Sequence, residues 1–399
     1  MGYFSKKSIF SLVLLLLFPS CGFGLRKLFT PTASTPANDQ LSDSTSAGGE
    51  DSGGSGGGGS GGEGGGSGGG GGGGPSGNHF AYVANSTSGT ISSFGLDTTS
   101  GALTLMGTSD FGSAMVSPTQ MVANSLGTCL FVSDQSLTSI SSLAIGAQGS
   151  LTIVQRLELP FVPGPLALSN NQALLYATST ASARLMWMNV GAGCALTYVN
   201  SMETEAGPTE FLPNVQGTAL FLASPIIGKI QPFILASGIP VSAASSGNEC
   251  LNANSLVQHP DTGRIYVGTT GDRICIFGVA GSSLSELSGS PQMMPTDTRH
   301  LMMDPLGEFL FAVSGNSGQV HMRQFNSDGT TVEVTAINPG HTPNLTAIDE
   351  AGKTFLVVNE LDETITSILI HRNGISSSLE IIDTKSVGVD PVGIVLVAP

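Results

Sequence analysis

The stretch FAYVANSTSGTISSFGLDTTSGALT, residues 80–104, contains a short apolar segment, YVAN, that ends in a polar residue. Six further segments of this kind follow it. The seven are YVAN from Tyr82, FVSD from Phe131, YATS from Tyr176, FLAS from Phe221, YVGT from Tyr266, FAVS from Phe311 and LVVN from Leu356. The first interval is 49 residues, and each of the next five is 45 residues. A fixed period of this length indicates a repeat protein built from one supersecondary unit.

Each repeat carries the pattern of four short strands. A second apolar position follows every anchor, at Ile91, Ile140, Leu185, Ile230, Ile274, Val320 and Ile365. A more variable segment such as GALTLMG comes next, and a further strand such as PLALSNNQ precedes every anchor except the first. Four strands in about 45 residues are typical of a β-propeller blade.

The two ends of the repeat region predict how the ring closes. The region opens at Phe80 on a second strand, and it ends with PVGIVLV, residues 391–397, which reads as a first strand. Together they complete one blade, so the sequence predicts an all-β, seven-bladed propeller with four antiparallel strands per blade, closed by the C-terminal strand. A single tryptophan excludes a WD dipeptide in every blade, and the helical periodicity of an α-solenoid is absent.

Residues 1–20 read as an export signal, because Lys6 and Lys7 precede an apolar run that is too short to cross a bilayer comfortably. The sequence FPSC, ending at Cys21, resembles the lipobox of bacterial lipoproteins, in which the cysteine is lipidated and becomes the first mature residue. An uncleaved membrane anchor is the alternative. Gly22 follows the cysteine, and by the sorting rule of that family this favours the outer membrane over the inner one.

Residues 21–79 predict a lipidated N-terminus followed by a disordered linker. Glycine crowds the segment 48–77, serines and acidic residues interrupt it, and no apolar residue is present to bury. We therefore expect the domain, residues 80–399, to be tethered to a membrane through its N-terminal lipid.

The charge of the domain bears on its partners. Residues 80–399 contain 10 Lys and Arg against 24 Asp and Glu, a net charge of −14. Nucleic acid and anionic lipid surfaces are therefore poor ligands. We expect a monomer without a cofactor that binds a small molecule or a protein.

The four cysteines of the domain are Cys129, Cys194, Cys250 and Cys275, and their spacing matches no metal-ligand pattern. An exported location permits disulfides. We expect buried free thiols, with one disulfide as the alternative.

Residues 80–104 resemble the lactonase propeller family, which includes bacterial 6-phosphogluconolactonases and the fungal carboxy-cis,cis-muconate cyclase. The resemblance extends over residues 80–399. It implies a site at one mouth of the channel, built from a histidine, two arginines and a glutamate on neighbouring blades.

Only one of these four positions is kept. In CLNAN, which begins at Cys250, Leu251 stands in place of the histidine. The segment TRHLMMDP keeps the first arginine as Arg299, VSGN places Gly315 where the glutamate is expected, and Val392 replaces the second arginine.

The tripeptide NEL, residues 359–361, reproduces the glutamate motif of the family one blade later than expected. Because the first two strands of a blade are antiparallel, the end of one and the start of the other face the same mouth, so Glu360 and Arg299 should share a rim. The candidate catalytic residues are Arg299, Glu360 and His300, and the candidate binding residues are Arg273, His341 and Asn344.

Structural roles are the alternatives for the same residues. Glu360 could be a solvated turn residue, Arg299 could form an ion pair with Asp297 or Glu360, and His300 could serve packing alone. The segment NSDGTT at Asn326 lacks the ligand spacing of a calcium loop, so we expect a hairpin turn and no metal site.

Two functions of different class follow. As a lactonase, the protein would stabilise charge with arginine and activate water with a carboxylate or histidine. As a binding module, the same mouth would hold a ligand or partner. The replaced positions and the export signal favour binding.

Overall fold

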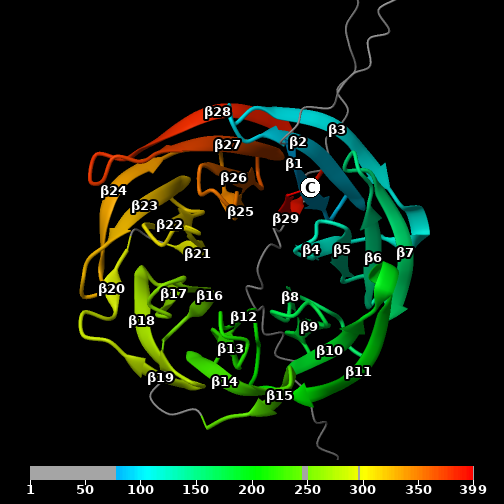
Figure 1. The fold of residues 1–399 in the computed structure, drawn as a ribbon, viewed down its shortest axis with the longest axis horizontal. Coiled ribbons are helices and arrows are strands. Elements are labelled where there is room, and N and C mark those ends of the chain that lie inside the picture. The colour runs from blue at the N-terminus through cyan, green and yellow to red at the C-terminus, as the bar shows by residue number, and fades with distance from the viewer. Residues whose placement is uncertain (1–77, 245–249, 295–296, 399) are drawn as a thin grey trace, which may run out of the picture. The chain divides into compact units, whose positions relative to one another are not determined.

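The computed structural model describes residues 78–244, 250–294 and 297–398. The predicted signal peptide, Cys21 and most of the predicted linker lie outside the described residues. The described chain forms seven antiparallel sheets arranged as a ring (Figure 1). The predicted seven-bladed propeller is therefore confirmed.

We number the blades 1 to 7 along the ring, beginning with the blade that contains β1. The innermost strands of blades 1 to 7 are β29 (Pro391–Val397), β4 (Pro118–Ala123), β8 (Leu166–Leu168), β12 (Glu210–Pro213), β16 (Ala253–Gln258), β21 (Thr298–Met303) and β25 (Pro343–Ile348). The second strands are β1 (Asn78–Asn85), β5 (Cys129–Asp134), β9 (Leu174–Ser179), β13 (Ala219–Ser224), β17 (Ile265–Thr269), β22 (Phe309–Ser314) and β26 (Thr354–Asn359).

The third strands are β2 (Thr90–Asp97), β6 (Ser139–Ile145), β10 (Arg184–Val190), β14 (Lys229–Ala236), β18 (Arg273–Ala280), β23 (Gln319–Phe325) and β27 (Thr364–His371). The outer strands are β3 (Leu103–Asp110), β7 (Leu151–Glu158), β11 (Leu196–Glu203), β15 (Ile239–Ser242), β19 (Ser283–Glu286), β24 (Thr331–Ile337) and β28 (Ser378–Ser386). Blade 5 carries an additional short strand, β20 (Gln292–Met293), which pairs with β18.

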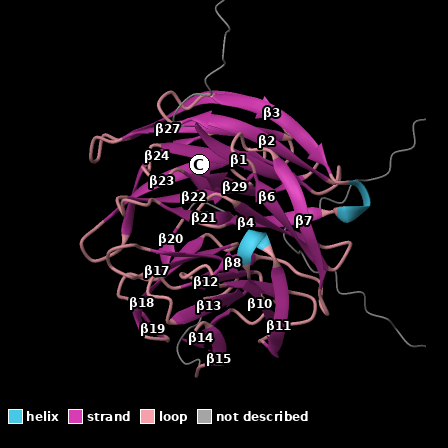
Figure 2. Cartoon of the chain, turned by 45° about the vertical axis from the view of Figure 1, so that its right-hand side comes forward, coloured by secondary structure: helices cyan, strands magenta, loops and turns pink. Residues whose placement is uncertain are grey.

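Figure 2 shows how completely strands dominate the described chain. Its helical segments are two short 3-10 turns, η1 (Gly112–Ala114) and η2 (Ala192–Cys194). The segment after Asn326 is a turn between β23 and β24, where the Asn326 N–H donates to the Thr330 carbonyl at 2.8 Å. The predicted hairpin is confirmed.

Blade 1 closes the ring with strands from both ends of the domain. Its strand order is β29-β1-β2-β3, with Tyr82 of β1 opposite Val395 of β29. In Figure 1 the red C-terminal strand lies inside the blue first strands, beside β25 and β4 of the neighbouring blades. This is the predicted closure.

The second strands have apolar sequences because they are buried. Every residue of β13, ALFLAS, is buried, whereas the outer strand β7, LTIVQRLE, alternates between partly buried and exposed residues. Both faces of a second strand pack against neighbouring blades. Phe221 of blade 4, for example, belongs to one core cluster with Val267 and Phe277 of blade 5.

Three tyrosines add hydrogen bonds between neighbouring blades. They lie on the second strands of blades 1, 3 and 5, and each hydroxyl donates to a glycine carbonyl in the turn before the outer strand of the next blade. The bonds join Tyr82 to Gly149 (2.9 Å), Tyr176 to Gly238 (2.5 Å) and Tyr266 to Gly329 (2.8 Å). The anchor residues of blades 2, 4 and 6 are phenylalanines, which only pack.

The expectation of buried free thiols is wrong, because the domain contains two disulfides. Cys129 at the start of β5 bonds to Cys194 in η2, with 5.5 Å between the Cα atoms and a sequence separation of 65. Cys250 bonds to Cys275 of β18, with a Cα separation of 6.1 Å. Each separation is within the range that a disulfide can bridge.

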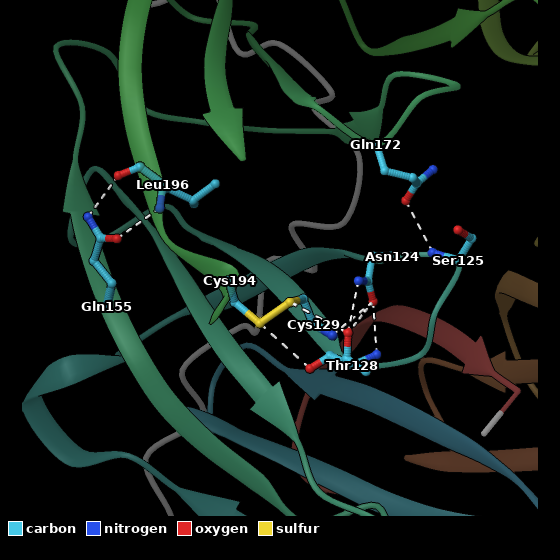
Figure 3. The surroundings of a disulfide bond; sticks show 8 residues. All are labelled: Asn124, Ser125, Thr128, Cys129, Gln155, Gln172, Cys194 and Leu196. Atoms are coloured by element: carbon cyan, nitrogen blue, oxygen red, sulfur yellow. Dashed lines mark hydrogen bonds between the residues drawn. A yellow bond between two sulfur atoms is a disulfide. The ribbon is translucent and has the colours of Figure 1, made fainter. Parts of the chain in front are cut away.

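The Cys129–Cys194 bond joins blade 2 to blade 3 (Figure 3). Beside it, the Gln155 side chain of β7 both donates to and accepts from the backbone of Leu196, each at 2.9 Å. The ring places loops of consecutive blades side by side. The disulfide and the two Gln155 hydrogen bonds therefore both link blade 2 to blade 3. Spacing along the chain could not reveal this proximity.

Candidate functional site

The starts of the innermost strands and the ends of the second strands lie at the same edge of each blade. The register shows this directly, since Thr298 pairs with Ser314 and Pro343 pairs with Asn359. We call this edge the rim. The predicted residues Arg299, Asn344 and Glu360 all lie on it.

The local backbone determines the direction in which these side chains point. The pairing of β21 with β22 skips Arg299, and the pairing of β25 with β26 skips Asn344. Both are therefore the extra residues of β-bulges, which turn a side chain out of the regular alternation of a strand.

In four consecutive blades, the residue directly before the innermost strand has a positive φ angle, in the left-handed region of backbone conformation. The φ angles are 62° at Asn252, 57° at Asp297, 55° at Thr342 and 61° at Asp390. This conformation is uncommon for residues other than glycine, and asparagine and aspartate adopt it most readily. The repeat thus places two carboxylates, Asp297 and Asp390, at the entry turns of blades 6 and 1.

Arg299 is held between two carboxylates. Its Nε lies 3.1 Å from Asp297 Oδ2, and its Nη1 lies 3.5 Å from Glu360 Oε2. Asn344 Nδ2 donates to Glu360 Oε2 at 3.3 Å, and Asn254 Nδ2 donates to the Arg299 carbonyl at 2.7 Å. We call Asp297, Arg299, Asn344 and Glu360 the rim cluster. The prediction that Arg299 and Glu360 meet at one rim is confirmed, and so is the ion pairing named as its alternative.

Burial and charge act in opposite directions on Glu360. Burial raises the pKa of its carboxyl group above the ordinary value, Arg299 lowers it, and the nearby charge of Asp390 raises it. The net result is a raised pKa, so Glu360 binds a proton more readily than a solvated glutamate does.

Gly315 leaves the space that the Arg299 side chain occupies. A Cβ atom at position 315 would lie 2.2 Å from Arg299 Nε and 2.6 Å from its Cζ. A glutamate at this position is therefore incompatible with the observed place of the guanidinium group. The glycine at position 315 and the turn of Arg299 toward Glu360 of blade 7 are therefore structurally linked.

The structure does not bring His300 or Arg273 into the rim cluster. The Nε2 atom of His300 is buried without a hydrogen-bond partner among the described residues, and burial lowers the pKa of this histidine to about 4. His300 is therefore neutral at physiological pH. Arg273 is exposed at the start of β18, and no ion pair joins its guanidinium group to the described residues.

His341 lies on the rim but pairs with a residue that the sequence did not single out. Its Nδ1 is 2.8 Å from Asp362 Oδ1. Asp362 follows Glu360 by two residues in the same loop, so proximity to the NEL motif was the available signal. Asn254 was also missed, because its contact is with a backbone carbonyl of the next blade.

The other two replaced positions offer no charge. Leu251 is 66% exposed and packs over Gly228, where a Cβ atom would lie 2.7 Å from its Cδ2. Val392 contributes only its carbonyl, which accepts from Gln120 Nε2 at 3.3 Å.

Within residues 78–244, 250–294 and 297–398, no three His, Cys, Asp or Glu side chains gather as a metal site. No helix in these ranges is both long and apolar enough to cross a membrane.

No family model matches this chain. A curated 6-phosphogluconolactonase from Enterobacter sp. is 22% identical over 194 residues, which cover 47% of this chain and 59% of that protein. The matched stretch thus spans less than two thirds of the relative.

Solved structures match more of the chain. A putative 6-phosphogluconolactonase from Bacteroides fragilis aligns with a TM-score of 0.68 at 16% identity, over 80% of this chain and 98% of that one. The periplasmic gluconolactonase PpgL of Pseudomonas aeruginosa gives 0.64 at 16% identity, over 80% and 99%. AztD from Citrobacter koseri gives 0.53 at 13% identity, over 81% and 99%.

Identities this low establish the fold and leave activity open. The sequence match and the blade count agree with the resemblance carried by residues 80–104. The chain therefore folds as a seven-bladed β-propeller that is similar in fold, and over 194 residues in sequence, to 6-phosphogluconolactonases.

Proposed function

We propose that the rim binds a small polar ligand and that the protein has not kept the complete catalytic set of the lactonases. The surroundings of Arg299 carry this proposal. Its guanidinium group contacts Asp297 and Glu360, so its positive charge is already balanced within the protein. A free arginine would stabilise a developing oxyanion far better than one that is already paired.

The replaced positions support the same conclusion. Leu251, Gly315 and Val392 carry no ionisable group where the resemblance implies a histidine, a glutamate and an arginine. What remains is a set of hydrogen-bonding groups suited to hydroxyl and carbonyl groups. Asn344 and Glu360 supply amide and carboxylate oxygens, and Arg299 supplies N–H donors.

The charge of the rim favours an uncharged ligand. Asp297 and Glu360 contact Arg299, Asp390 acts on Glu360, and the domain as a whole is strongly acidic. A phosphorylated sugar would therefore be repelled, whereas a neutral sugar lactone would not. The fold neighbour PpgL is, by its name, a periplasmic gluconolactonase.

Binding is testable with δ-gluconolactam, a neutral analogue of the lactone that does not hydrolyse. We expect residues 78–399 to bind it in a calorimetric titration, and Arg299→Ala to weaken binding about tenfold or more because charge-assisted hydrogen bonds are lost. Arg156→Ala is the matched control, since Arg156 lies on the outer strand of blade 2 and pairs there with Glu158. Binding that survives Arg299→Ala and Glu360→Ala would place the ligand elsewhere.

The N-terminal region leads to a second proposal, that the domain is a lipoprotein anchored through Cys21, with the outer membrane as its destination. Two disulfides in the domain fit an oxidising compartment. We expect Cys21→Ala to move the protein from the membrane to the soluble fraction, because a lipid at this position is the proposed anchor. Fractionation of the variant with membranes, as for wild type, would mean that the anchor lies elsewhere.

A further inference from the structure

His341 and Asp362 form a doubly bonded pair on the rim. His341 Nδ1 lies 2.8 Å from Asp362 Oδ1, and the His341 backbone N–H donates to Asp362 Oδ2 at 2.7 Å. One carboxylate thus fixes both the main chain and the ring of the same histidine. The backbone hydrogen bond is the main reason that the pKa of Asp362 is lowered, which keeps the carboxylate ionised.

This arrangement determines which ring nitrogen is available. An ionised carboxylate at Nδ1 favours the tautomer with hydrogen on Nδ1, so Nε2 carries the free lone pair. The His341 side chain is 77% exposed, which leaves Nε2 accessible to water. The same relation of carboxylate, imidazole and free Nε2 prepares a histidine for general-base catalysis.

The pair is held in place by close packing. Gly340 has a φ of 157°, and a Cβ atom there would lie 2.6 Å from Asn359 Cγ and 2.9 Å from Asp362 Oδ2. The chain before His341 therefore lies directly against the loop that carries Asp362. Only glycine allows this approach.

Short contacts connect the pair to the rim cluster. The Glu360 N–H donates to the Thr342 carbonyl at 3.0 Å, next to His341. Glu360 in turn accepts from Asn344 and contacts Arg299. His341 and the rim cluster, the proposed ligand-binding group, thus share one edge of blades 6 and 7.

We propose that His341 is the general base for hydrolysis of an uncharged lactone at the rim, with Asp362 as the residue that positions it. The proposal rests on the proposed function in one respect, namely that such a ligand binds at the rim. It supplies a histidine from blade 7 where Leu251 has replaced the one implied by the resemblance.

The reaction is a hydrolysis with water as the nucleophile. His341 Nε2 takes a proton from water as the water oxygen bonds to the carbonyl carbon. The tetrahedral intermediate then breaks the bond between that carbon and the ring oxygen, and the proton passes from His341 to the departing alkoxide oxygen. The product is the open-chain hydroxy acid, and no oxidant, reductant or metal is required.

The substrate class follows from the charges that surround the pair. Asp362, Glu360 and Asp297 outnumber Arg299 among the charged groups that these contacts join, so an anionic lactone is disfavoured. δ-Gluconolactone is the matching neutral probe.

The experiment measures proton release from δ-gluconolactone above the spontaneous rate. His341→Asn keeps an amide donor toward Asp362 and removes Nε2. We expect it to lower kcat about 10²-fold or more while the affinity for δ-gluconolactam is unchanged. Asp362→Asn should also lower kcat with little change in KM, and Asp362→Glu should restore part of the rate.

His371→Gln is the matched control. His371 is an exposed histidine of the same blade, paired through Nε2 with Glu380 at 2.7 Å, and it ends β27, away from the rim. The control variant should retain the wild-type rate, which excludes hydrolysis by surface histidines in general.

Three outcomes would overturn the inference. If wild type binds δ-gluconolactam but does not accelerate hydrolysis, or if His341→Asn retains the wild-type rate, His341 is not the base and the binding proposal stands. If wild type neither binds the lactam nor hydrolyses the lactone, both proposals are wrong.

Discussion

Removing residues 390–399 is expected to abolish the cooperative thermal transition of the propeller or to lower its midpoint drastically. The deletion exposes the edge of β1 and removes Ile394, Val395, Leu396 and Val397, which pack against the clusters on both sides of blade 1. Burial of four such side chains contributes on the order of 5 kcal/mol. A typical domain is stable by only about 5–15 kcal/mol, so most of the stability is lost.

A circular permutant tests whether the loss of β29 in blade 1, and not the truncation as such, causes the destabilisation. Val397 lies opposite Phe80, so β29 ends beside the start of β1. A chain in which residues 388–398 precede Asn78 through a short linker should recover the melting temperature, because the strand completes the same blade from the other end. Calorimetry on the three proteins decides the matter. A truncated domain that melts like the full one would rule out closure by β29.

The fold was predictable because its signal is periodic and local. Each second strand is buried on both faces, so it must be apolar, and each must end at a similar point, so the spacing repeats. The orphan strands at the two ends then allowed one closed arrangement. No comparable constraint exists for the cysteines. Their partners depend on which loops of the ring lie side by side, as for Cys129 and Cys194.

The candidate site was predictable only in part. Antiparallel pairing places the end of one strand beside the start of its neighbour, and this was sufficient to bring Glu360 to Arg299. The further contacts depend on features that have no sequence period. Examples are the left-handed turn at Asp297, the bulge at Arg299 and the space left by Gly315.

His300 shows that a residue next to a motif residue in sequence need not lie at the same site. It adjoins Arg299 in the segment TRHLMMDP, yet its Nε2 is buried and its pKa is lowered to about 4. His341, which stood outside the family motifs, lies on the rim with an accessible ring and a carboxylate partner. Side-chain direction and burial, more than proximity in sequence, separate the two.

We expect the domain to hydrolyse 6-phosphogluconolactone no faster than the spontaneous reaction. Loss of one oriented donor or base typically costs 10² or more in rate. By the family resemblance, Leu251, Gly315 and Val392 stand where three such groups are expected, and Arg299 is paired with carboxylates. The acidic rim should also repel the phosphate group, so little 6-phosphogluconolactone should bind beside Arg299 and Glu360.

The rate of 6-phosphogluconolactone hydrolysis by the purified domain, followed as proton release, is the most direct test that the rim binds without the catalytic set of the lactonases. The predicted result is a rate equal to the spontaneous background for wild type, Arg299→Ala and Glu360→Ala alike, while δ-gluconolactam still binds wild type. Turnover by wild type that disappears in both variants would contradict the account, since it would show that Arg299 and the displaced Glu360 form a working phospholactonase site.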